Sequence, residues 1–215
     1  MREDFPDLAT GVLLVQGIGP CADAAESITR LTAIATERIT RGSEAELPEI
    51  VAWRRAFSRM GLKPTQYRCA SEALLRRLRK EGGLPTTHAF VDLCNATSLA
   101  YAIPVAAFDL DRITDGLTVR RAIGTELYET FSGELEQPDQ GEVIFADNGS
   151  RAHARRWTNR QSGHSAVRVG THSAVVVAEA LHGSARADVA RLIDSLEASI
   201  QRLWPGASVQ KVSMP

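Results

Sequence analysis

The middle of the chain, from Ile103 to Leu181, is divided into short apolar segments by aspartate, glycine and proline, and this division most limits what the sequence can fold into. Such segments between turn-forming residues are typical of β-strands and are too short for stable helices. We expect strands over residues 103–108, 117–121, 126–130, 143–146, 166–169 and 173–181. An earlier apolar run, 11–17, predicts one more short buried strand.

Apolar residues at helical spacing flank this β-rich part on both sides. They predict helices over residues 20–41, 48–60, 68–80, 87–101 and 185–204. Pro20 and Pro48 suit the first turn of a helix, and Pro205 ends the last helix. Helices around a β-rich middle indicate an α+β domain with central, mostly antiparallel β-structure.

A chain of 215 residues with 44% hydrophobic and 24% charged residues fits one globular domain. We expect a core over residues 46–182, an N-terminal strand–helix extension over 1–45, and a C-terminal helix and tail over 183–215. The N-terminus is acidic and its apolar run is short, so we predict no secretion signal. Since no apolar run approaches the roughly 20 residues of a membrane span, we also expect no membrane partner.

The three cysteines support a reducing, cytoplasmic location. Cys21, Cys69 and Cys94 are widely separated and odd in number, so they form neither a metal-binding pair nor a disulfide framework. The sequence sets no oligomeric state.

The net charge of −1 hides a strong segregation of charge along the chain. Residues 53–80 carry nine basic side chains and one acidic one, and residues 151–168 carry five basic side chains and no acidic one. Residues 1–50 sum to −5 and residues 109–147 to −7. The first basic block fits either a phosphate-binding surface or the solvated faces of helices. The second favours a binding function, because an indole and amides lie among its arginines.

Several common chemistries are excluded by missing motifs. The five histidines have no metal-ligand spacing, and neither a GxSxG turn nor a GK[ST] motif occurs. Gly17 and Gly19 lack the third glycine of a dinucleotide-binding loop. Cys94 lies in an apolar helix, where burial should raise its pKa. We therefore predict no metal, no cofactor and no cysteine nucleophile.

The polar residues of the apolar helix, Asp92 and Asn95 among them, either tie it to neighbouring loops or line a pocket, and spacing alone favours the first.

Six short motifs resemble a known family when taken in order. They are VDLCN at 91–95, Pro104, AFDLDRI at 107–113, VRRA at 119–122, SGELEQP at 132–138 and VIFAD at 143–147. Together they resemble the B3/B4 region of the phenylalanyl-tRNA synthetase beta subunit, over roughly residues 68–182. The resemblance implies a B3/B4-like fold. It also implies an editing function, since that region removes tyrosine mistakenly attached to the phenylalanine tRNA. Without the flanks of a full subunit, and with an RRWTNRQSG segment like that of free-standing bacterial members, we expect a stand-alone module.

The resemblance transfers only some of the family's pocket residues. Asn95 and Pro104 match pocket-lining positions, whereas Cys94 stands where the synthetase has threonine. Ala106 replaces the editing histidine in the run that ends at Asp109. Residues 157–162 replace the glycine-rich segment bearing the glutamate that reads the tyrosine hydroxyl, and no acid here matches that glutamate. Tyrosine specificity therefore does not transfer.

The resemblance implies a role for each matched residue. An aminoacyl ester is already activated, so water and the neighbouring ribose hydroxyl can cleave it without a protein nucleophile. Asn95 is the expected catalytic residue, orienting the ester or the water. The expected pocket residues are Asp92, Cys94, Pro104, Ala106, Asp109 and Ser162, with the two aspartates holding its frame. Trp157 is expected to stack on the terminal adenine of tRNA. The expected RNA-binding residues are Arg54, Arg55, Arg68, Arg76, Arg77, Arg155, Arg156, Trp157, Asn159 and Arg160.

Two functions follow as hypotheses. The first is a trans-acting hydrolase of mischarged aminoacyl-tRNA, with an unknown amino acid. The second is a non-catalytic module that keeps the fold and binds tRNA or an amino acid. The expected nucleic-acid partner is tRNA or aminoacyl-tRNA, and no DNA partner is expected. The decisive structural observation is whether Asn95, Ala106 and residues 157–162 line one cavity, with the basic blocks at its rim.

Overall fold

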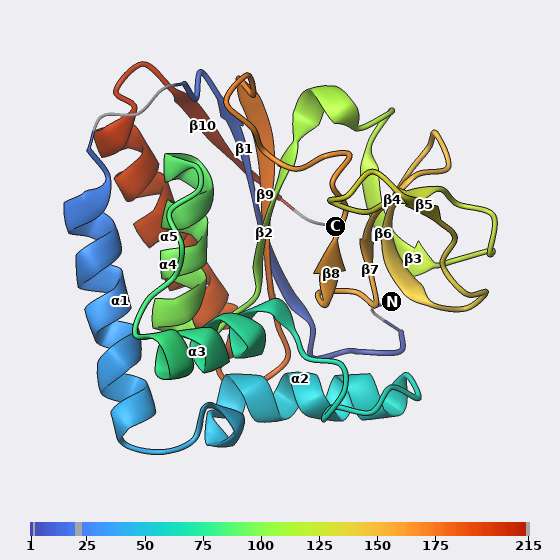
Figure 1. Cartoon of the computed structure of the whole chain (residues 1–215), viewed down its shortest axis with the longest axis horizontal. Coiled ribbons are helices and arrows are strands. Elements are labelled where there is room, and N and C mark those ends of the chain that lie inside the picture. Colours follow the sequence, from blue (N-terminus) through green and yellow to red (C-terminus); the bar gives the residue numbers. More distant parts are fainter. Residues whose placement is uncertain (2, 20–22, 214–215) are drawn as a thin grey trace.

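An antiparallel four-stranded sheet organises the molecule in the computed structural model, which describes residues 1, 3–19 and 23–213 (Figure 1). Its strands are β1 (Ala9–Gln16), β2 (Val105–Asp109), β9 (Ser173–Ala180) and β10 (Ser208–Val212). Their order is β10-β1-β9-β2, so β2 is an edge strand. Both neighbours of β1 and the one neighbour of β2 run antiparallel to it.

Helices cover one face of this sheet. They are α1 (Ala25–Thr40), α4 (Ala89–Tyr101) and α5 (Ala185–Leu203), while α2 (Pro48–Arg59) and α3 (Ala70–Glu81) lie across one end (Figure 1). Strand residues alternate between faces, so Leu13 and Val176 pack under the helices, whereas Val12 and Val177 face away from them. The nearly continuous apolar sequence of α4 is explained by its position, because most of its residues are buried.

The second face of the sheet packs against a smaller β-structure. Its antiparallel strands, in the order β3-β6-β7-β8, are β3 (Leu117–Arg121), β6 (Val143–Asp147), β7 (Ala152–Arg155) and β8 (Arg160–Gln161). A hairpin of β4 (Tyr128–Glu129) and β5 (Leu135–Glu136) lies beside it. Single-turn 3₁₀ helices occupy Glu44–Glu46 and Leu110–Arg112. Phe108 and Phe145 join the two sheets, with ring centroids 5.5 Å apart.

The α+β prediction is confirmed, and most predicted elements occur near their expected limits. Pro48 is in the first turn of α2, as predicted, whereas α1 begins at Ala25 and the predicted start at Pro20 lies outside the described residues. The strand predicted over 166–169 is wrong. Only Ala166 makes a bridge, to Phe108, and Val169 is exposed. No helix in the described part of the chain is long and apolar enough to cross a membrane.

The predicted N-terminal extension contributes an inner strand of the main sheet. β1 lies between β9 and β10, and it pairs with β9 from Ala9 to Gln16. The division of the chain into an extension, a core and a tail stays a prediction.

Candidate functional site

Strand β2 separates two cavities. Its side chains alternate, so Val105 and Ala107 face α4 while Ala106 faces the second sheet. On the α4 side lies an open cavity of about 660 Å³, which we call the Asn95 pocket. On the opposite side lies a cavity of only about 60 Å³, which we call the Ala106 cavity.

The Asn95 pocket is formed by α4, β2, the loop between α3 and α4, and the loop before β9. His88, Val91 and Asn95 line it at a spacing of three and four residues, which places them on one face of α4. Val105, Ala107 and other aliphatic side chains form an apolar floor. The complete lining is Leu74, Arg77, Leu84, Pro85, Thr87, His88, Val91, Cys94, Asn95, Val105, Ala107, Phe131, Gln161, Ala166, Val167, Arg168, Val169 and Gly170.

Three polar side chains in this pocket have donors or acceptors to offer a ligand. Asn95 is partly exposed, and its amide has no hydrogen-bond partner among the described residues. The His88 Nδ1 accepts from the backbone N–H of Phe90, which caps α4 and leaves the ring proton on Nε2. Gln161 is held by its Nε2, which donates to the carbonyl oxygen of Ala107 at 2.7 Å.

The charge around the Asn95 pocket is positive. Arg77 and Arg168 line it, and no aspartate or glutamate does so among the described residues. Arg77 is paired with Glu81 at 2.7 Å, whereas Arg168 donates to the backbone carbonyl of Gly163 at 3.0 Å. A pocket without carboxylates favours an electron-rich ligand.

Asp92 and Asp109 support the walls of this pocket through hydrogen bonds. The Asp92 carboxylate accepts from the N–H of Thr87 and, at 2.8 Å, from its hydroxyl, which ties the preceding loop to α4. Asp109 accepts at 2.7 Å from the hydroxyl of Thr171 and so fixes the loop before β9. Burial raises the pKa of Cys94 to about 12, as predicted, and its thiol stays protonated at neutral pH.

A buried indole borders the Ala106 cavity. Trp157 is fully buried, with ring centroids 4.9 Å from Trp53 and 5.0 Å from Phe5. Its Nε1 donates to Glu179 Oε2 at 2.8 Å, and Glu179 lines the same cavity as Pro104 and Ala106. Burial raises the pKa of Glu179 to about 7. The hydrogen bond from the indole N–H stabilises the carboxylate and so lowers this pKa in part.

The raised pKa of Glu179 predicts a loss of stability as pH rises. The folded chain keeps this proton up to about pH 7, whereas the unfolded chain releases it near pH 4.5. The contribution of Glu179 to the free energy of unfolding is therefore complete below pH 4.5 and is lost as the pH rises from 4.5 through 7. The loss amounts to roughly 3 kcal/mol at most. Urea denaturation of the wild type and of Glu179→Gln across pH 4.5–8 isolates this group, because other carboxyls cancel in the difference. We expect the variant to gain stability relative to the wild type as pH rises; a pH-independent difference contradicts this.

Asn95, Ala106 and residues 157–162 do not all line one cavity. Asn95, on α4, faces Val105 and Ala107 of β2 across its pocket. Ala106 lies between these two residues and points to the opposite face of the strand, so it borders the other cavity. Gln161 lines both cavities. Ser162, an expected pocket residue, lines neither; it is fully buried, and its hydroxyl donates to the carbonyl of Glu129 at 2.8 Å.

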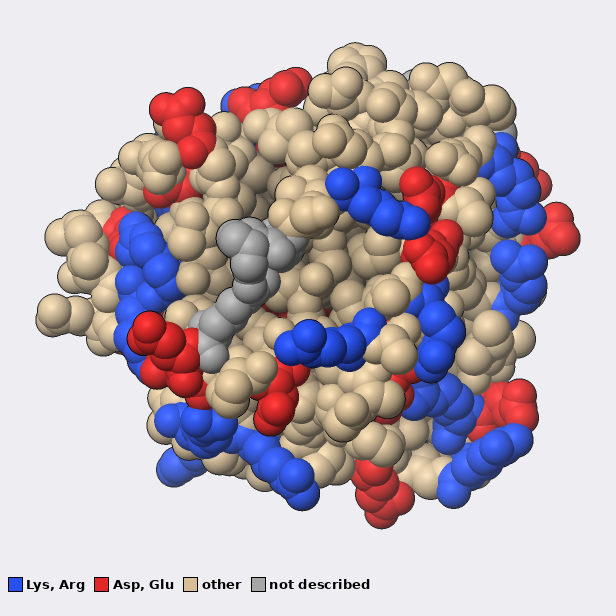
Figure 2. Space-filling view, turned by 180° about the vertical axis from the view of Figure 1, so that it is seen from behind, with Lys and Arg blue, Asp and Glu red and all other residues tan. Residues whose placement is uncertain are grey.

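The basic blocks do not form one free cationic surface. Many of their arginines are paired with carboxylates. Arg54 and Arg68 pair with Glu72 of the same block, whereas carboxylates outside the blocks pair with the others: Arg76 with Glu44, Arg155 with Glu136 and Glu142, and Arg160 with Glu136. On the face seen in Figure 2, basic side chains lie in several separate groups, many of them beside acidic ones. The segregation along the sequence is therefore partly cancelled in space.

Two of the residues expected to contact RNA, Trp157 and Arg155, are buried. Trp157 has no exposed ring face on which a base could stack, since it lies in the core. Arg155 is buried, and all three of its guanidinium nitrogens donate to carboxylates, so none is open to a phosphate. Asn159 donates to the backbone carbonyl of Arg68.

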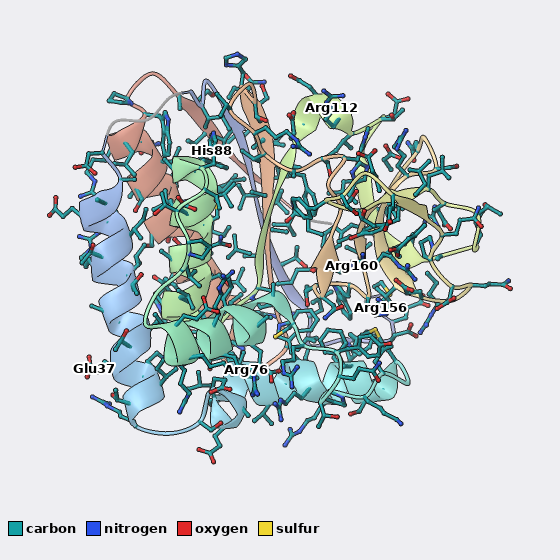
Figure 3. The ribbon with its side chains drawn as sticks, in the orientation of Figure 1. Glu37, Arg76, His88, Arg112, Arg156 and Arg160 are labelled. Atoms are coloured by element: carbon teal, nitrogen blue, oxygen red, sulfur yellow. The ribbon has the colours of Figure 1, made fainter. Side chains whose placement is uncertain are left out.

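Two of the other expected contacts remain open to solvent without a carboxylate partner among the described residues. Arg55 is exposed on α2, and Arg156 lies over the ring of Tyr67 at 4.7 Å. Figure 3 shows Arg156 and Arg160 together at the β7–β8 turn, away from His88 at the start of α4.

A serine–histidine–aspartate arrangement in the second sheet is closed to solvent. His153 Nδ1 lies 2.8 Å from Ser165 Oγ, and its Nε2 lies 3.2 Å from Asp147 Oδ2 without hydrogen-bond alignment. All three side chains are buried and line neither cavity beside β2. The described residues also hold no cluster of three or more potential metal ligands.

Comparison with known proteins identifies the family. The B3/4 domain family matches residues 52–212, which is most of the chain. The chain belongs to the B3/4 domain family. This membership confirms the resemblance seen in the sequence motifs.

The B3/4 domain of this chain is similar to part of much longer proteins. It is 31% identical over 80 residues to the phenylalanine–tRNA ligase beta subunit of Rickettsia conorii, covering 37% of this chain and 10% of the relative. It is 30% identical over 119 residues to that of Chromobacterium violaceum, covering 53% and 15%. A solved N-terminal fragment of the phenylalanyl-tRNA synthetase beta subunit from Pyrococcus horikoshii matches with a TM-score of 0.47 and 11% identity, over 59% of this chain and 45% of that one.

Sequence reasoning missed several residues that line these cavities. His88, Phe131 and Arg168 border the Asn95 pocket, and Glu179 borders the Ala106 cavity. A lone histidine before a helix and a glutamate within an apolar strand were visible in the sequence, but only the packing gives them a site. Phe131 carries no local pattern that would separate it from a core residue.

Proposed function

We propose that this B3/4 domain hydrolyses the ester bond of mischarged aminoacyl-tRNA in the Asn95 pocket. The observation that carries the proposal is the Asn95 amide on α4, which has neither a hydrogen-bond partner nor a neighbouring pocket carboxylate among the described residues and faces an open pocket. The volume of about 660 Å³ suits a small ligand such as an aminoacyl nucleotide. Membership of the B3/4 family, with phenylalanine–tRNA ligase beta subunits among its relatives, supports the same reaction class.

The residues of the pocket suit hydrolysis by water without a covalent intermediate. The water oxygen attacks the ester carbonyl carbon, the bond from that carbon to the ribose oxygen breaks, and the water's proton passes to the ribose oxygen. The vicinal ribose hydroxyl can relay this proton. Negative charge develops on the carbonyl oxygen, where the Asn95 amide and the His88 Nε2–H are available as donors. Cys94, protonated in its buried site, takes no part.

The floor of the pocket favours an apolar aminoacyl group. Val91, Val105 and Ala107 offer no partner for a charged side chain, whose burial would be costly. Substrates of this kind place the protein with tRNA in the cytoplasm.

The test is release of amino acid from a panel of mischarged tRNAs. The protein is incubated with tRNAs carrying each amino acid in turn, and ester hydrolysis is followed against the uncatalysed rate. We expect acceleration for at least one apolar amino acid. No acceleration on any member of the panel would sink the proposal.

One observation favours a second function, a non-catalytic module that binds tRNA or an amino acid. Ala106, at the position of the family's histidine, faces a cavity of only about 60 Å³ that the buried Trp157 borders, which is too small for an aminoacyl group. Salt-dependent binding of tRNA without any release of amino acid would support this alternative.

A further inference from the structure

Two large apolar side chains are exposed at the mouth of the Asn95 pocket. Phe131 is 70% exposed and Val169 is 81% exposed, and both line the pocket. They come from different parts of the chain, the β4–β5 turn and the loop before β9. Exposed apolar side chains that gather at one pocket, unlike singly scattered ones, are typical of a ligand-binding groove.

Phe131 is presented by a rigid turn. The Thr130 carbonyl oxygen accepts from the Gly133 N–H at 3.1 Å, and the Thr130 N–H donates to the Glu134 carbonyl oxygen at 2.9 Å, which closes the turn around Phe131. Gly163 packs directly behind it, because a Cβ at Gly163 would lie 2.5 Å from the Thr130 carbonyl oxygen and 3.0 Å from the Phe131 Cα. An exposed aromatic ring on a fixed backbone is preorganised for binding.

An arginine is anchored to the same glycine. The Arg168 Nη2 donates to the Gly163 carbonyl at 3.0 Å, and the Arg168 backbone N–H donates to the Thr171 hydroxyl at 3.0 Å. Thr171 in turn donates to Asp109. Arg168 is exposed and has no carboxylate partner among the described residues. Gly163 therefore brings a free aromatic face and an unneutralised guanidinium to one side of the pocket.

We propose that this mouth binds the 3′-terminal nucleotide of a single-stranded RNA end. The terminal base stacks on Phe131 and packs against Val169, and the adjoining phosphate pairs with Arg168. An ester on the ribose of that nucleotide then reaches the amide of Asn95 inside the pocket. This inference rests on the proposed hydrolysis. Of the residues it assigns to the RNA end, only Arg168 belongs to a basic block of the sequence.

Fluorescence of a short RNA tests the stacking. The probe is the single-stranded 5′-ACCA-3′ with 2-aminopurine at its 3′ end, titrated with the full chain. We expect binding to quench the probe, and Phe131→Ala to weaken binding by about 10-fold or more, the usual value of one stacked base. Leu135→Ala is the matched control, because Leu135 is 63% exposed on the neighbouring strand and does not line the pocket. The proposal is overturned if the wild type does not bind the probe or if Phe131→Ala binds as the wild type does.

The salt dependence of binding tests Arg168. Loss of one phosphate contact lowers the slope of log Kd against log salt by about 0.7 for a single strand. We expect this change for Arg168→Gln and not for Arg186→Gln, an exposed arginine at the start of α5. An unchanged slope for Arg168→Gln contradicts the phosphate contact.

Hydrolysis that is insensitive to Phe131→Ala overturns this inference and leaves the proposed function intact. RNA binding that depends on Phe131, in the absence of any hydrolysis, supports the RNA contact at Phe131 and overturns the proposed function.

Discussion

Asn95→Ala is expected to lower kcat/KM for hydrolysis of mischarged tRNA by about 10²–10³-fold, the usual cost of one lost oxyanion donor. The amide is partly exposed in the pocket and has no partner among the described residues, so its removal should leave the fold intact. Single-turnover hydrolysis measures the rate, and circular dichroism checks the fold.

Two further variants make this result interpretable. Asn95→Asp keeps the shape but replaces the donor by an anion beside the developing charge, so we expect an equal or larger loss. Tyr101→Phe removes a polar group from the same helix at its far end, where the hydroxyl donates to the backbone of Arg191, and should keep the wild-type rate. Full activity of Asn95→Ala would mean that the reaction does not use this pocket.

Trp157→Ala is expected to destabilise the fold by about 3–5 kcal/mol, the usual cost of removing a fully buried aromatic ring. The ring contacts Trp53 and Phe5 from two sides, and its loss would also leave Glu179 without its hydrogen-bond donor. The free energy of unfolding in urea measures the effect.

A conservative variant separates packing from hydrogen bonding at this position. Trp157→Phe keeps much of the ring volume but removes the indole N–H, so we expect an intermediate cost of about 1–3 kcal/mol from the unsatisfied carboxyl. If Trp157→Ala changed the stability by less than about 1 kcal/mol, the ring could not be the core residue described above.

Elements with strong local patterns could be predicted from the sequence, and those that depend on distant partners could not. Pro48 and the apolar spacing after it define α2, and the run Leu117–Arg121 is a strand with its predicted limits. Strand β7 was missed because Arg155 and His153 look exposed in the sequence, yet both are buried against carboxyl or hydroxyl partners far along the chain. β8 is too short to have a pattern of its own and exists through pairing with β7.

The same distinction holds for the candidate site. The motif order pointed to Asn95, which does line an open pocket, but a one-residue step along β2 separates Ala106 from it. Charge summed along the chain could not reveal that Glu44 and Glu136, from outside the basic blocks, pair with arginines of these blocks. The cluster around Gly163 joins residues far apart in the sequence, so only the fold could show it.

The position of a bound substrate analogue distinguishes the two cavities beside β2 most directly. A suitable analogue is adenosine with an apolar amino acid joined to the 3′ position by an amide, which water does not cleave readily. In a crystal structure of this complex we expect the amide carbonyl at hydrogen-bond distance from Asn95 and the adenine against Phe131, with the Trp157 indole still bonded to Glu179. An analogue lying against Ala106 and Glu179, with Trp157 displaced, would contradict hydrolysis in the Asn95 pocket.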